Sequence, residues 1–272
     1  MKKLYFSVLC LCFQALIFYG YCLNPEKIYK YTTDDFGLNI ADSLKIKTSD
    51  GYNIFIYLFN PKSNIINKTI ILSYGDAGNL SYYFSYAKRL TDYGYSVVLF
   101  DYRGFGKSDD FEIDKNHLFY TEFAIDLSTV ICYTKSKYPQ NSIGIMAFSM
   151  GTIFATLVSD TNSIDFIISE NYVTNIYSVK ERLERITQNY SSFLLPPNIT
   201  EKEYLSKINE IRVPILVFSS ILDKVTTLED SYIFSNNDKC KIVPYEGNHG
   251  CGLVTLSENY FQEINQFLKN TN

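Results

Sequence analysis

The chain contains, near its middle, the segment Ser142-Ile-Gly-Ile-Met-Ala-Phe-Ser-Met-Gly-Thr-Ile-Phe-Ala-Thr156. The apolar residues 143–148 predict a buried strand, and residues 152–158 have the composition of a helix. A strand that turns directly into a helix holds the turn residue, here Ser149, in a strained and exposed conformation. Its neighbours must be small because the two backbones come close together. Taken alone, the pattern Ala-x-Ser-x-Gly fits an ordinary strand-to-helix turn equally well.

The rest of the chain alternates strand and helix patterns. A hairpin is expected at 43–48 and 53–59, single strands at 69–73, 96–100, 165–169, 213–219 and 239–243, and helices at 81–93, 119–137, 228–235 and 257–268. Such alternation predicts an α/β fold: a mostly parallel sheet with helices on both faces. Residues 171–211 interrupt this alternation of strands and helices, and we interpret them as a small cap or lid insertion.

Four polar residues follow predicted strands: Asp76, Ser149, Asp223 and His249. Because the carboxyl ends of parallel strands share one edge of a sheet, we expect these residues to lie together. A serine hydroxyl becomes a nucleophile when a base removes its proton, and the base must be oriented by an acid. The chain has only two histidines, so His249 is the candidate base, and Glu170 is the rival of Asp223 for the acid role.

The order Ser149, Asp223, His249 goes with the strand-turn-helix motif. Together with segments 73–79, 101–108, 147–151 and 247–249, it resembles the α/β-hydrolases, and among them the Bem46-type serine hydrolases. The resemblance covers about residue 40 to the end of the chain.

The resemblance implies a role for each matching position. Ser149 would be the nucleophile, His249 the general base and Asp223 the orienting acid. The backbone N–H groups of Asp76 and Met150 would form the oxyanion hole. No metal and no cofactor is implied.

The sequence departs from the family at two positions. Ala147 replaces the first glycine of the motif, and Tyr74 replaces a histidine that supports the oxyanion loop. Three further residues have other interpretations: Arg103 belongs to a tight turn and not to a phosphate loop, Asp126 is a solvated or helix-packing residue, and His117 is a surface residue.

The N-terminus, Met1-Lys2-Lys3, precedes a run without charges from Leu4 to Leu23. This pattern is typical of an export signal and is also long enough to span a bilayer. We therefore expect an exported or membrane-anchored, extracytoplasmic protein, with residues 1–22 as a cleaved signal peptide, an uncleaved anchor or a lipoprotein leader ending at Cys22. Residues 23–272 would form the hydrolase domain.

Three cysteines lie outside the leader, without metal-ligand spacing, and two of them, Cys240 and Cys251, are close enough in sequence to pair in an oxidising compartment. The net charge is −4 and no cluster of basic residues exists, which argues against nucleic-acid binding. The sequence thus predicts a serine hydrolase acting on a small or acylated ester or thioester. The alternatives are a peptidase or amidase on the same fold and a binding protein that has lost catalysis. Membrane association would come through the N-terminal segment, and the oligomeric state is open.

Overall fold

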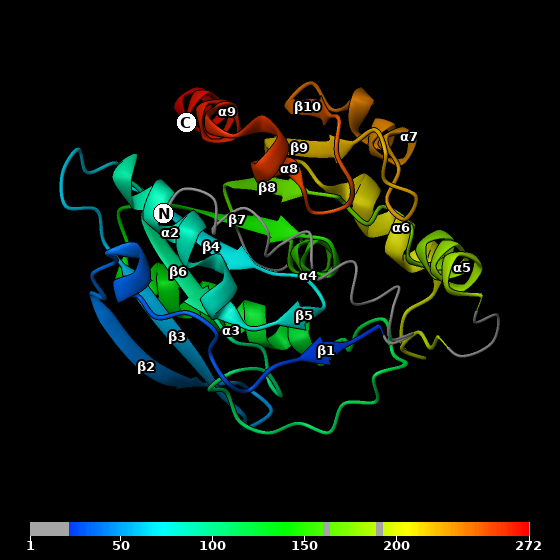
Figure 1. The fold of residues 1–272 in the computed structure, drawn as a ribbon, viewed down its shortest axis with the longest axis horizontal. Coiled ribbons are helices and arrows are strands. Elements are labelled where there is room, and N and C mark those ends of the chain that lie inside the picture. The colour runs from blue at the N-terminus through cyan, green and yellow to red at the C-terminus, as the bar shows by residue number, and fades with distance from the viewer. Residues whose placement is uncertain (1–21, 160–163, 189–192, 272) are drawn as a thin grey trace.

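A computed structural model describes residues 22–159, 164–188 and 193–271. Its centre is an eight-stranded sheet in the order β10-β9-β8-β7-β4-β6-β3-β2 (Figure 1). The strands are β2 Asp42–Lys47, β3 Asn53–Phe59, β4 Lys68–Ser73, β6 Ser96–Phe100, β7 Ser142–Phe148, β8 Phe166–Glu170, β9 Ile215–Ser220 and β10 Cys240–Tyr245. Neighbours from β10 to β6 are parallel, and β3 is antiparallel to both β6 and β2.

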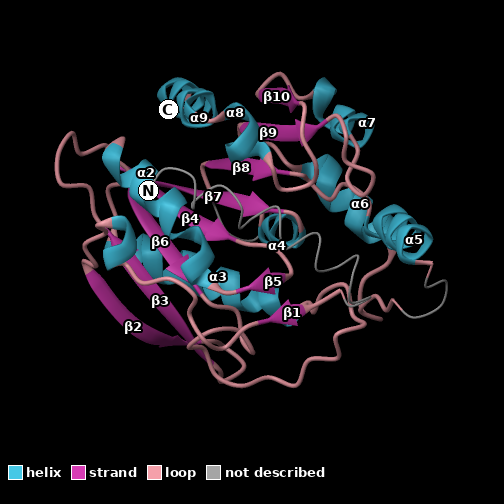
Figure 2. Ribbon diagram, viewed as in Figure 1, coloured by secondary structure: helices cyan, strands magenta, loops and turns pink. Residues whose placement is uncertain are grey.

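Helices cover the sheet in two groups (Figure 2). Helices α3 (Glu122–Lys137) and α4 (Met150–Val158) contact one another. Helices α2 (Phe84–Asp92) and α9 (Glu258–Asn270) are joined by the ion pair Arg89–Glu258. The other helices are α5 Ile176–Thr187, α6 Glu201–Glu210, α7 Leu228–Ser231 and α8 Gly252–Leu256, with 3₁₀ turns at Asp34–Phe36, Leu80–Tyr83 and Tyr232–Asn236. The predicted α/β-hydrolase architecture is confirmed.

The central strands are buried on both faces, which explains their continuous apolar sequence. The hairpin differs, because β2 is the edge strand and alternates exposed and covered side chains. In residues 171–211 the structure describes α5 and α6, and α6 begins with a capping box between Thr200 and Glu203.

From its polar sequence without strong periodicity, the N-terminal lead-in, residues 24–39, is expected to be extended. Residues 24–25 form strand β1 (Asn24–Pro25), which pairs in parallel with β5 (Ala77–Gly78). Cys22, which we expected to lie outside the fold, is only 2% exposed. The predicted leader otherwise falls on residues 1–21, outside the described residues. Within the part of the chain that the structure describes, we find no helix of the length and apolarity needed to cross a bilayer.

The suggested pairing of Cys240 with Cys251 is wrong, because Cys240 is a free thiol. Cys240 opens β10, and Cys251 follows the other end of that six-residue strand. A strand of this length spans roughly 20 Å, whereas a disulfide joins Cα atoms less than about 7 Å apart.

Candidate active site

Ser149 lies at the junction of β7 and α4 with φ +48° and ψ −118°, a backbone conformation that residues other than glycine rarely adopt. The junction is tight, since a Cβ on Gly151 would lie 2.0 Å from the carbonyl oxygen of Ser73. The strained turn predicted from the small residues around Ser149 is therefore present. Ala147 is fully buried at the end of β7, where its methyl group is accommodated in the core.

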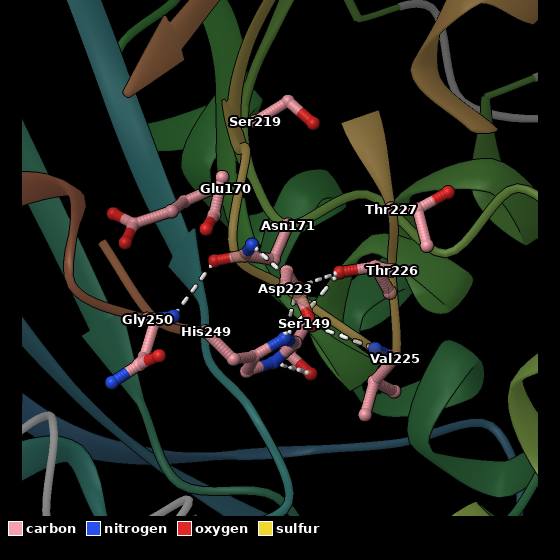
Figure 3. Close-up of polar contacts among 12 residues, drawn as sticks. Ser149, Glu170, Asn171, Ser219, Asp223, Val225, Thr226, Thr227, His249 and Gly250 are labelled. Atoms are coloured by element: carbon pink, nitrogen blue, oxygen red, sulfur yellow. Dashed lines mark hydrogen bonds and ion pairs between the residues drawn. The ribbon is translucent and has the colours of Figure 1, made fainter. Parts of the chain in front are cut away.

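The three predicted site residues from distant parts of the chain meet at this turn (Figure 3). His249 Nε2 is 2.9 Å from Ser149 Oγ, and His249 Nδ1 is 2.6 Å from Asp223 Oδ2. Each residue follows a parallel strand: β7 for Ser149, β9 for Asp223 and β10 for His249. The imidazole therefore connects the hydroxyl to the carboxylate.

The electrostatics of the pair favour a proton on His249. Burial of the imidazole lowers its pKa, but the charge and the hydrogen bond of Asp223 outweigh burial and raise the pKa above its usual value. Burial of Asp223 raises the pKa of that carboxyl, but the charge of His249 and several hydrogen bonds lower it overall. An ionised Asp223 therefore stabilises an imidazolium at His249.

Two loops, one after β8 and one after β9, donate hydrogen bonds to the carboxylate of Asp223. Its Oδ2 accepts hydrogen bonds from the Thr226 hydroxyl at 2.5 Å and from Asn171 Nδ2 at 2.8 Å, and its Oδ1 accepts one from the Val225 N–H at 2.8 Å. Asn171 directly follows β8 and has φ +57°, a conformation that asparagine tolerates better than most residues. Asn171 was not predicted as a site residue from the sequence. Its position directly after a strand was the one feature that could have indicated it.

Glu170, the rival acid, has other partners. Its carboxylate accepts hydrogen bonds from the Tyr260 hydroxyl and the Gly252 N–H, both at 2.7 Å. Burial raises the pKa of this carboxyl. The acid next to Nδ1 of His249 is thus Asp223, and Glu170 ties β8 to α8 and α9.

Residues 22–31, which we call the N-terminal strap, support the loop after β4. The Asn24 N–H donates to the Asp76 carbonyl at 2.9 Å, and the Glu26 N–H donates to the Gly78 carbonyl at 2.9 Å. In return, the Asn79 amide donates to the carbonyls of Glu26 and Ile28. The sequence analysis missed the strap because a two-residue strand has no hydrophobic periodicity.

Tyr74 also supports the loop after β4. The Tyr74 hydroxyl donates to Asp101 Oδ1 at 3.3 Å, and Asp101 also accepts hydrogen bonds from the Leu80 N–H at 2.9 Å and the Tyr29 hydroxyl at 2.5 Å. The Tyr74 ring stacks on Tyr83 with 5.4 Å between centroids. A tyrosine in place of the family's histidine therefore still anchors the loop, through a buried carboxylate.

Two cavities meet at Ser149 and His249. The first, which we call the aliphatic cavity, has about 530 Å³ of empty space, part of it open to solvent, and its walls include Leu118, Ile153, Val173, Ile176, Val179 and Leu183. Three of its residues, Ile176, Val179 and Leu183, belong to α5 in the predicted cap. The second, which we call the aromatic cavity, has about 550 Å³ of empty space, also partly open to solvent, beside Tyr82, Tyr83 and Phe148. Asp76 lines both cavities, and Cys22 lines the aliphatic one.

The remaining predicted residues lie away from the nucleophile. Asp126 is not solvated, as one interpretation had it: it is fully buried and pairs with Arg103 at 2.7 Å, while Arg103 also pairs with Asp50 at 2.5 Å. The guanidinium of Arg103, at the turn after β6, is thus paired with two carboxylates. His117 stacks on Tyr120 near the surface.

Comparison with known proteins agrees with this fold. The family described as "Serine aminopeptidase, S33" matches residues 65–168. Esterase Pf2001 of Pyrococcus furiosus superposes with a TM-score of 0.73 at 19% identity, covering 92% of this chain and 98% of that one. The chain has the α/β-hydrolase fold. An α/β serine hydrolase homologue from Coxiella burnetii superposes on this α/β-hydrolase less closely, with a TM-score of 0.58 at 16% identity over 86% of this chain and 99% of that one.

Two curated relatives of this chain are described as uncharacterized proteins. Protein R595 of Acanthamoeba polyphaga mimivirus is 27% identical over 241 residues, which cover 88% of this chain and 70% of the relative. Protein YfhR of Escherichia coli K12 is 24% identical over 218 residues, 77% of this chain and 73% of the relative. Support for hydrolase chemistry comes from the family that matches residues 65–168, and the placement among the Bem46-type enzymes stays a prediction.

Proposed function

We propose that this α/β-hydrolase is a serine hydrolase that cleaves an ester or thioester by way of an acyl-enzyme on Ser149. The observation that carries the proposal is the continuous hydrogen-bonded path from Ser149 Oγ through both nitrogens of His249 to Asp223. The path places a nucleophile, a base and an orienting acid in the spatial order that a catalytic triad requires.

In the proposed reaction, His249 Nε2 takes the proton of Ser149 while Oγ attacks the substrate carbonyl carbon. The carbonyl oxygen becomes an oxyanion, which the N–H groups of Asp76 and Met150 would stabilise. Met150 is the first residue of α4, so its N–H has no acceptor within the helix. The imidazolium then protonates the leaving alcohol or thiol, and water hydrolyses the acyl-enzyme by the same steps.

The two cavities favour a substrate with two unlike halves. The aliphatic cavity suits an acyl chain, because its wall is formed largely by branched apolar side chains. The aromatic cavity, which Ser149 also lines, would take the leaving group. Amide cleavage is the second candidate, and the description "Serine aminopeptidase" of the matching family supports it.

A fluorophosphonate probe tests the proposal on the purified full chain. We expect covalent labelling of the wild type, loss of labelling in Ser149→Ala, and labelling slowed by several orders of magnitude in His249→Ala. Ser159→Ala is the matched control, since this half-exposed serine lies at the other end of α4. A wild type that stays unlabelled would favour the non-catalytic binding protein. Hydrolysis of 4-nitrophenyl esters beside the matching anilides then separates esterase from amidase activity.

A further inference from the structure

Glu170 contacts the candidate site at two points, and the proposed reaction assigns it no task. Its backbone carbonyl accepts the N–H of Ser149 at 3.0 Å, and its carboxylate accepts the N–H of Gly252 at 2.7 Å. The carboxyl group points away from Asp223 (Figure 3), which alone is bonded to Nδ1 of His249 among the two carboxylates. One buried residue thus connects the nucleophile to the loop that carries the base.

The contact with Gly252 fixes the far end of the loop that carries His249. Gly252 lies three residues after His249 and is the first residue of α8, so its N–H has no acceptor within the helix. A residue other than glycine would disturb the contact, because a Cβ on Gly252 would lie 2.9 Å from the carboxyl carbon of Glu170. The carboxylate and the backbone of the loop are therefore packed directly against each other.

The same end of β8 holds this loop at a second point. Asn171, the residue after Glu170, accepts the Gly250 N–H through its Oδ1 at 2.8 Å. His249 therefore lies just before a segment with two hydrogen bonds to the end of β8, and Ser149 has a third. Because the base and the nucleophile are both tied to one strand end, the distance of 2.9 Å between His249 Nε2 and Ser149 Oγ depends on these bonds.

Three tyrosines from different elements surround the carboxyl group of Glu170. The Tyr260 hydroxyl of α9 donates to it at 2.7 Å and the Tyr245 hydroxyl of β10 at 3.4 Å. Tyr86 of α2 is close enough for the charge of Glu170 to contribute to its raised pKa, which burial dominates. Burial raises the pKa of Glu170 as well, whereas the donors and the charge of His249 favour its ionised form.

The charges of Glu170 and His249 act on each other. Burial lowers the pKa of His249, and the carboxylates that raise it are Asp223, Asp76 and Glu170. An ionised Glu170 therefore stabilises the imidazolium that forms when His249 takes the proton of Ser149. The geometry of the loop and the charge behind it thus favour the same step of the reaction.

We propose that Glu170 is a positioning residue for the base: its carboxylate fixes the loop after β10 so that His249 Nε2 reaches Ser149 Oγ, and its charge stabilises the imidazolium. This inference rests on the proposed function, since it concerns the base of the same site. Glu170 itself takes no proton and forms no bond to the substrate.

Two substitutions of Glu170 separate the hydrogen bond from the charge. Glu170→Gln keeps the size of the side chain and an oxygen that can accept the Gly252 N–H, but it removes the charge. Glu170→Ala removes both. We expect kcat for a 4-nitrophenyl ester to fall by about tenfold to a hundredfold in Glu170→Ala and by less in Glu170→Gln, with little change in KM, because a buried donor left without a partner costs more than a weakened bond.

Gly252→Ala tests the same contact from the other side. Its methyl group would push against the carboxylate while Glu170 stays in place, so kcat should fall by about tenfold here too. Together with Glu170→Gln, this variant decides the question if Glu170→Ala does not fold. Asp126→Asn alters a buried carboxylate away from the nucleophile, and as the control for lost stability it should keep the wild-type kcat.

The pH dependence of kcat/KM gives a readout that a purely structural role would not change. Glu170→Gln removes one of the charges that raise the pKa of His249, so the midpoint of its acid limb should lie at lower pH than in the wild type. Asp126→Asn should leave this midpoint in place.

Wild-type kcat in Glu170→Gln and Gly252→Ala, with an acid limb that does not move, would overturn the inference and leave the serine hydrolase standing. The same follows if Asp126→Asn lowers kcat as much as these variants do. If the fluorophosphonate probe fails to label the wild type, the inference falls together with the proposed function.

Discussion

Asn171 joins the acid and the base of the site: its Nδ2 donates to Asp223 Oδ2 at 2.8 Å, and its Oδ1 accepts the Gly250 N–H at 2.8 Å (Figure 3). Gly250 directly follows His249, so one buried side chain connects the loop after β9 with the loop after β10. The Tyr245 hydroxyl also donates to this Oδ1, at 3.0 Å. Asn171 is therefore a positioning residue, and it acts on catalysis through Asp223 and His249.

Replacing Asn171 should impair catalysis more than substrate binding. In Asn171→Ala we expect kcat to fall by about tenfold or more with little change in KM, because the loss of one buried hydrogen bond costs roughly 1–3 kcal/mol. Steady-state kinetics on a 4-nitrophenyl ester measure both constants. Asn175→Ala, which removes the exposed cap of α5, is the control for a purely structural loss. Equal effects of the two variants on kcat would contradict a positioning role.

The pH dependence of kcat/KM should report the raised pKa of His249. The imidazole must be neutral to accept the proton of Ser149, so activity rises with pH through this pKa. Because Asp223 raises it, the midpoint of the acid limb should lie above the usual histidine value of about 6.5. In Asp223→Asn the midpoint should move to lower pH, and turnover should fall by orders of magnitude. A midpoint that stays in place would show that Asp223 does not set this pKa.

The strap should contribute to catalysis through the backbone of the oxyanion loop. Asn24→Pro removes the N–H that donates to the Asp76 carbonyl, whereas Asn24→Ala keeps it. We expect kcat to drop by about tenfold in the proline variant only, since one hydrogen bond contributes about 1 kcal/mol and the loop also loses order. The rate of fluorophosphonate labelling gives a second measure. Identical rates in the two variants would contradict a contribution of the strap to catalysis.

The buried ion pair of Arg103 and Asp126 should matter for stability. Asp126→Asn leaves the guanidinium with Asp50 alone, and losing one partner of a buried pair costs about 3–5 kcal/mol. Asp92→Asn, which breaks the exposed pair of Asp92 with Lys88, should cost less than about 1 kcal/mol. Urea unfolding of both variants compares the two losses directly. A loss in Asp126→Asn no larger than the control would mean that Asp50 compensates.

Much of the fold was predictable because the signals are local. The strands are apolar runs between turn residues, and the observed β7 and β10 lie within two residues of their predicted ends. The predicted helix at 257–268 appears as α9, preceded by the short α8 that periodicity did not reveal. The two-residue strands β1 and β5 were not predicted either. Strands this short show no periodicity, and each is stabilised by pairing with the other, which is distant in sequence.

For the site, the chain order of Ser149, Asp223 and His249 was enough to select these three residues, because parallel strands bring residues after their carboxyl ends to one edge. Which acid faces His249, the placement of Cys22 in the cavity wall and the bridge through Asn171 follow only from tertiary packing. These contacts join distant parts of the chain: Ser149 and His249 are a hundred positions apart, and Cys22 lines the same cavity as His249. Nothing in the local sequence encodes their distances.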